Sequence, residues 1–160
     1  MDTFFMIITW GGSALLLGPL SLIFSVILYF RRRIRDSLLM VGGFSGAMIL
    51  SHLLKILVAR PRPEMEKMLV TMPSDFSFPS AHTSQIFAFA LSSVIVLHGD
   101  LSKTRRKTVR AILMSLAILV GISRVYLEVH YISDVIFGAL LAIVWVVILH
   151  KLSTKIIRTT

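Results

Sequence analysis

Residues 132–149 read ISDVIFGALLAIVWVVIL, an apolar run of 18 residues in which Asp134 is the one charged side chain. A helix of about 20 apolar residues is long enough to cross the hydrocarbon core of a bilayer. Because a helix bonds its own backbone groups, it needs no water to satisfy them in lipid. The run therefore predicts a transmembrane helix that carries a carboxylate near one end.

Four more apolar stretches have the same character, and the five together predict an all-α, polytopic membrane helical bundle. The first stretch is longer than a bilayer requires, and we expect tilt to take up the surplus. The fourth is short, but Arg110 and Arg124 at its ends can extend their charged groups toward the interface. The four additional stretches are residues 4–30, 37–58, 81–97 and 109–123.

The composition of the whole chain agrees with a membrane protein. Of its 160 residues, 56% are hydrophobic and 16% are charged, and the mean hydropathy is +0.84. A soluble domain of this size would need more polar surface to cover itself. The length predicts one membrane-embedded domain over residues 1–160. The chain has no cysteine, which excludes disulfides and thiolate metal sites.

The net charge of +9 comes largely from three basic groups between the apolar stretches. With five spans all three groups fall on one side, which the positive-inside rule makes cytoplasmic. The N-terminus is then outside and the C-terminus cytoplasmic. No aromatic and basic platform accompanies the charge, so we expect no nucleic-acid partner. The groups are Arg31, Arg32, Arg33 and Arg35; Lys103, Arg105, Arg106, Lys107 and Arg110; and Lys151, Lys155 and Arg158.

Three polar segments fall on the opposite, outer side, where charged groups near membrane depth are costly and usually functional. The first contains Lys55 and Arg62, which are seven residues apart. This spacing is about two helical turns, so both side chains can point the same way. A lysine and an arginine together suit a phosphate, as a point charge and a bidentate fork. The alternative is a pair of basic residues that anchors a helix end.

The second polar segment lies at the start of the stretch 81–97. Ser80 is a natural N-cap, and a helix N-terminus offers free N–H groups to an anion. His82, in the first turn, is placed to give a proton to a leaving oxygen. The alternative is an ordinary capped helix with a hydrogen-bonded histidine.

The third polar segment contains Arg124, His130 and Asp134. The last two are four residues apart, so on a helix they share one face and can touch. A carboxylate on one imidazole nitrogen fixes the tautomer and leaves the other nitrogen free to attack. Arg124 supplies charge to a developing phosphoryl transition state. The alternative is a His–Asp pair on a helix surface.

The combination of these segments resembles the three-part signature of the type 2 phosphatidic acid phosphatase superfamily. That superfamily also includes soluble acid phosphatases and vanadium haloperoxidases. The matching region covers residues 55–134, half of the chain. The family usually has glycine where this chain has Ala81, and its membrane members commonly have six spans. The matching motifs are Lys55-x6-Arg62-Pro63, Pro79-Ser80-Ala81-His82 and Ser123-Arg124-x5-His130-x3-Asp134.

The resemblance implies a lipid phosphatase that transfers a phosphoryl group in two steps and uses no metal or other cofactor. It makes His130 the nucleophile, Asp134 its orienting partner and His82 the acid that protonates the leaving group. Water then hydrolyses the phosphohistidine. By the same resemblance, the phosphoryl oxygens are held by Lys55, Arg62, Ser80, Ala81 through its N–H, and Arg124.

We expect the substrate to be a phosphorylated lipid that reaches the outer face of a bacterial inner membrane by lateral diffusion. Undecaprenyl diphosphate and lipid A 1-phosphate rank above phosphatidylglycerol phosphate and phosphatidic acid. Two alternatives stay open: a phosphotransferase with a lipid acceptor, and a non-catalytic lipid-binding membrane protein. A missing catalytic residue would favour the second alternative, and none is missing. The sequence does not predict an oligomeric state.

Overall fold

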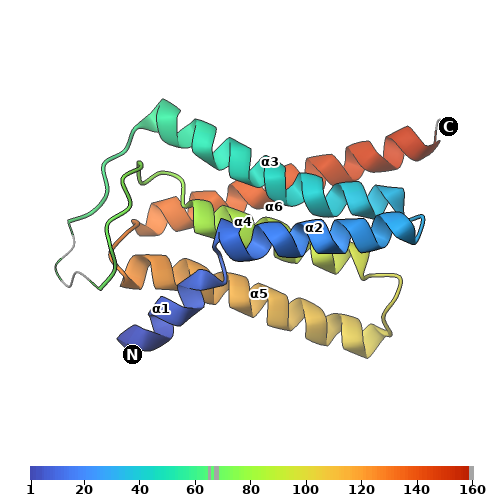
Figure 1. Ribbon diagram of the computed structural model, residues 1–160, viewed down its shortest axis with the longest axis horizontal. Coiled ribbons are helices and arrows are strands. Elements are labelled where there is room, and N and C mark those ends of the chain that lie inside the picture. The colour runs from blue at the N-terminus through green and yellow to red at the C-terminus, as the bar shows by residue number, and fades with distance from the viewer. Residues whose placement is uncertain (65, 67–68, 159–160) are drawn as a thin grey trace.

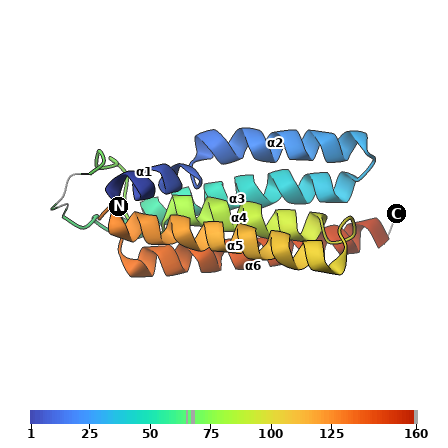
Figure 2. The same cartoon turned by 90° about the horizontal axis from the view of Figure 1, so that it is seen from below.

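The computed structural model describes residues 1–64, 66 and 69–158, with side chains through Thr154. The described chain is all helical, and helices α2 to α6 run beside one another in alternating directions (Figures 1 and 2). The predicted all-α, polytopic membrane bundle is therefore confirmed. The helices are α1 (Asp2–Trp10), α2 (Ala14–Phe30), α3 (Ile34–Val58), α4 (Ala81–Val96), α5 (Lys103–Tyr126) and α6 (Ile132–Arg158).

The first apolar stretch forms two helices, so the expectation of one tilted helix is wrong. Helix α1 ends at Trp10, and α2 begins after Ser13, whose hydroxyl accepts the Leu16 N–H at 3.3 Å. A Cβ on Gly12 would lie 3.0 Å from the backbone oxygen of His82, so the connection passes close to the start of α4. The pair of glycines before a capping serine is a recognisable break signal.

Within the residues that the structure describes, four segments are long and apolar enough to cross a membrane, and the central helix α4 is shorter. Its 16 residues make a helix about 24 Å long. Buried residues lie on every face of α4, because α3, α5 and α6 pack around it. Protein rather than lipid therefore surrounds this helix. The four long segments are Asp2–Phe30, Ile34–Val58, Lys103–Tyr126 and Ile132–Thr154.

The two ends of the bundle differ in charge. The turns after α2 and α4 and the end of α6 gather at one end, shown on the right of Figure 1. The three basic groups lie in or directly beside these segments, the second of them at the start of α5. The connections 59–80 and 127–131 meet at the other end, beside α1. The three basic groups therefore gather at one end of the bundle, as expected for five spans. Which end is cytoplasmic stays a prediction.

The start of α6 packs directly on the start of α4. A Cβ on Gly138 would lie 2.7 Å from the backbone oxygen of Ser80, so only glycine allows this approach. The Ser80 N–H also donates to the backbone oxygen of Asp134 at 3.0 Å. This contact brings the second and third polar segments together.

Candidate active site

A pocket of about 230 Å³ opens at the end of the bundle where the connections 59–80 and 127–131 meet. Six of the eight predicted site residues line it. The other two, Ser80 and Asp134, are fully buried behind the pocket wall. Residues from three helices and two connections therefore surround one small space. The six lining residues are Lys55, Arg62, Ala81, His82, Arg124 and His130.

His130 and Asp134 are in contact, but not on one face of a helix as the sequence predicts. His130 lies in the connection before α6, and Asp134 lies in the first turn of that helix. The turn closes through the Asp134 N–H, which donates to the backbone oxygen of Tyr131 at 3.0 Å. His130 Nδ1 then lies 3.4 Å from Asp134 Oδ2. The four-residue spacing produces the contact through a turn.

The other ring nitrogen of His130, Nε2, lies 3.3 Å from Arg62 Nη1. Burial lowers the pKa of His130 to about 4, with Arg124 and Arg62 acting in the same direction and Asp134 opposing them. The ring is therefore neutral near pH 7. With the Nδ1 proton directed at Asp134, Nε2 carries a lone pair, which is the form that can attack phosphorus.

Asp134 is held by two residues outside the predicted signature. Arg60 Nη1 donates to its Oδ1 at 2.8 Å, and the Ser77 hydroxyl donates to its Oδ2 at 2.5 Å. The Arg60 guanidinium also lies over the Tyr131 ring, 4.0 Å from its centroid. These contacts fix the carboxylate that faces His130. Sequence spacing could not identify these two residues, because both lie far from Asp134 in the chain. Arg60 also has the same charge as its near neighbour Arg62, so charge alone does not distinguish them.

The start of α4 has the predicted cap. Ser80 Oγ accepts the Thr83 N–H at 3.5 Å and the Thr83 hydroxyl at 2.9 Å. His82 and Ala81 lie in the first turn and line the pocket. The positive end of the helix dipole therefore points toward the pocket, which favours an anion there.

Arg124 has hydrogen-bonding capacity to spare. Arg124 is only 6% exposed, and its Nη1 donates to Thr9 Oγ1 of α1 at 2.6 Å. Its Nε has no hydrogen-bond partner among the described residues. A buried guanidinium donor normally has a partner, so this unused donor fits a bound anion. The contact from Thr9 was not predictable, since α1 lies far from Arg124 in sequence.

Asp75 pairs with the other two cations of the pocket. Its carboxylate lies 3.2 Å from Lys55 Nζ and forms an ion pair with Arg62. Partial burial alone would raise the pKa of Asp75, but Arg62 and Lys55 hold it below its usual value. A phosphate at these cations would therefore compete with a carboxylate that the sequence analysis did not identify.

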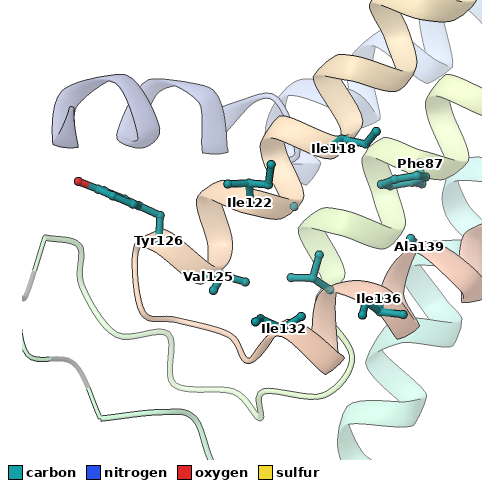
Figure 3. A pocket seen from close by; sticks show the side chains of 10 residues that line it. Phe87, Ile118, Ile122, Val125, Tyr126, Ile132, Ile136 and Ala139 are labelled. Atoms are coloured by element: carbon teal, nitrogen blue, oxygen red, sulfur yellow. The ribbon is translucent and has the colours of Figure 1, made fainter.

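An apolar groove of about 540 Å³ lies between α4, α5 and α6 (Figure 3). Val125 and Ile132 line both the groove and a neighbouring polar pocket, which His130 also lines. The apolar groove is therefore separated from His130, the candidate nucleophile, only by this polar pocket. No cluster of three or more His, Cys, Asp or Glu residues that could hold a metal occurs in the described part of the chain.

Comparison with known proteins agrees with the geometry. The chain is 33% identical to phosphatidylglycerophosphatase B of Bacillus subtilis, over 94% of this chain and 74% of that protein. It is 30% identical to an undecaprenyl-diphosphatase of Sulfolobus acidocaldarius, over 73% of this chain and 55% of that protein.

Two solved structures are similar to the whole bundle. One is a transmembrane PAP2 type phosphatidylglycerolphosphate phosphatase from Bacillus subtilis, with a TM-score of 0.84, 31% identity, and coverage of 97% of this chain and 77% of that one. The other is LpxE of Aquifex aeolicus, with a TM-score of 0.65, 29% identity, and coverage of 94% and 85%. The sequence profile of the PAP2 superfamily matches residues 36–158, more than three quarters of the chain. The resemblance seen in the three motifs is thus confirmed, and this chain belongs to the PAP2 superfamily.

Proposed function

We propose that this membrane protein hydrolyses a lipid phosphate or diphosphate through a phosphohistidine formed at His130. One observation carries the proposal. A neutral imidazole, oriented by a buried carboxylate, shares a small pocket with a second histidine and three cationic side chains. These are the groups that phosphoryl transfer through a covalent intermediate needs.

The proposed reaction has two displacements. Nε2 of His130 attacks phosphorus while the bond to the leaving oxygen breaks and His82 gives that oxygen a proton. Lys55, Arg62 and Arg124 hold the non-bridging oxygens together with the Ala81 N–H at the helix N-terminus, while Ser80, buried behind the pocket wall, caps that helix. His82 then takes a proton from water as the water oxygen attacks the phosphohistidine. The P–N bond breaks, orthophosphate is released, and the free His130 ring is restored.

A lipid substrate is supported by the surroundings of the pocket. The site lies at the end of a bundle whose outer surface is apolar, and one polar pocket separates it from an apolar groove. The names of the relatives point to both glycerophospholipid and prenyl diphosphate substrates. We propose an envelope lipid from one of these classes, or lipid A 1-phosphate.

The test is phosphate release by the purified protein in detergent, measured with four lipids. These are undecaprenyl diphosphate, lipid A 1-phosphate, phosphatidylglycerol phosphate and phosphatidic acid. We expect release from at least one lipid, at a rate that EDTA does not change, because the proposed chemistry uses side chains alone. Absence of release from all four, or strong loss of activity in EDTA, would overturn the proposal.

We also propose that the pocket faces the periplasm or exterior of a bacterial inner membrane, with the basic end cytoplasmic. The chain has no cysteine, so single cysteines can report the side directly. We expect Gly99→Cys, at a position with open space around it, to react with an impermeant maleimide only after cells are permeabilised. Ser74→Cys, exposed at the opposite end, is the matched control and should react in intact cells. The reverse pattern would refute the orientation.

A further inference from the structure

The pocket continues beyond the groups assigned to the phosphate. His52 and Gln85 also line it. His52 precedes Lys55 by three residues on α3, and Gln85 follows His82 by three residues on α4, so each is one helical turn away. Because α3 runs toward this end of the bundle and α4 runs away from it, both residues lie one turn deeper (Figure 1).

Gln85 is buried without a partner for its carbonyl oxygen. The residue is 3% exposed, and its Oε1 has no hydrogen-bond partner among the described residues. Buried side-chain oxygens are nearly always hydrogen-bonded, because leaving one unpaired forfeits its interaction with water. Since Gln85 lines the pocket, a group on a bound molecule can supply the missing donor.

His52, an exposed residue of α3, presents a second acceptor to the same part of the pocket. Its Nδ1 lies 3.0 Å from the backbone oxygen of Met48, and a carbonyl oxygen can only accept. In the neutral ring Nδ1 therefore carries the proton, and Nε2 is left with a lone pair. A phosphate near pH 7 offers mainly acceptors, so it is a poor match to these two acceptor atoms. A hydroxyl group, which donates, does match them.

We infer that Gln85 and His52 form a subsite that binds a free hydroxyl on the leaving alcohol of the substrate. The inference rests on the proposed function, since His82 marks the side of the phosphate from which the alcohol leaves. Gln85 lies on the same helix one turn beyond His82, where the carbons next to the leaving oxygen would lie. The subsite favours a phosphorylated polyol headgroup, such as glycerol, over a prenyl diphosphate, whose leaving group is itself a phosphate.

A matched pair of substrates tests the subsite. Phosphatidylglycerol phosphate has a free hydroxyl on the carbon next to the phosphorylated one, and its 2′-deoxy analogue differs by that group alone. We expect kcat/KM to be at least about tenfold higher for the hydroxylated lipid, because its absence leaves the buried Gln85 oxygen unpaired. In Gln85→Met, which has a similar shape, the ratio should fall toward one.

Ser92→Ala is the matched control variant. Ser92 is also buried on α4 with an unpartnered oxygen, but it does not line the pocket, so its variant should keep the wild-type ratio. A wild-type ratio near one, or an unchanged ratio in Gln85→Met, overturns the inference. If Gln85→Met does not fold, the wild-type ratio and His52→Ala decide. Phosphate release from both lipids without discrimination would reject the subsite and leave the proposed phosphatase function standing.

Discussion

His130→Ala is expected to lower phosphate release from the preferred lipid by about four orders of magnitude or more, as losses of catalytic nucleophiles do. The variant has no nitrogen to attack phosphorus, and the remaining cations can only bind the substrate. The measurement is the single-turnover rate in detergent. The phosphoenzyme is trapped in parallel by denaturing the protein without acid. Wild-type protein should yield a phosphorylated chain that is labile to acid and stable to alkali, and the variant should yield none.

The control for this prediction is another histidine at the opposite end of the bundle. His98 contacts Arg106 near the turn between α4 and α5, and His98→Ala should keep nearly full activity. Loss of activity confined to His130→Ala would separate catalysis from general damage by a histidine substitution. If His130→Ala retained a tenth of the wild-type rate, a covalent intermediate at this residue would be excluded.

Most of the bundle was predictable, because a membrane-spanning helix is specified by a continuous apolar segment. The exception is instructive. The stretch 4–30 is apolar throughout, so hydropathy alone joins its two helices, yet Gly11, Gly12 and Ser13 separate them. A Cβ at Gly12 would lie 2.6 Å from a Val120 methyl of α5 and 3.0 Å from the His82 backbone oxygen of α4, so the connection passes close to both helices. The local sequence marks the break, but the packing that requires glycine there comes from helices distant in the chain, which hydropathy does not show.

The site shows the same division. The sequence motifs predicted six of the residues that line the pocket, because their spacing and chemistry are specific in combination. The side chains that hold them were not identified. Arg60, Ser77, Asp75 and Thr9 act through partners distant in sequence, so no local pattern reveals them. Gln85 was missed for a different reason: a single glutamine in an apolar helix belongs to no recognisable motif.

His82→Ala is expected to give the second largest effect, a loss of about 10²–10⁴-fold with a lipid alcohol as leaving group, which is the usual contribution of general acid catalysis. An alkoxide leaves poorly unless it is protonated as the P–O bond breaks. A phenol with an electron-withdrawing substituent leaves without that help. With p-nitrophenyl phosphate, therefore, formation of the phosphohistidine by His82→Ala should lose less than about tenfold.

The second displacement makes the prediction sharper. Hydrolysis of the phosphohistidine still needs a base for the attacking water, and the variant lacks one. His82→Ala should thus release one nitrophenol per enzyme in a fast burst and then turn over slowly, as the phosphoenzyme accumulates. His150 lies at the basic end beside Arg35, so His150→Ala is the control. Its burst and its steady-state rate should equal those of the wild-type protein. An equal loss with the lipid and with the aryl phosphate would mean that His82 only binds phosphate, and the general acid would have to be sought elsewhere in the pocket.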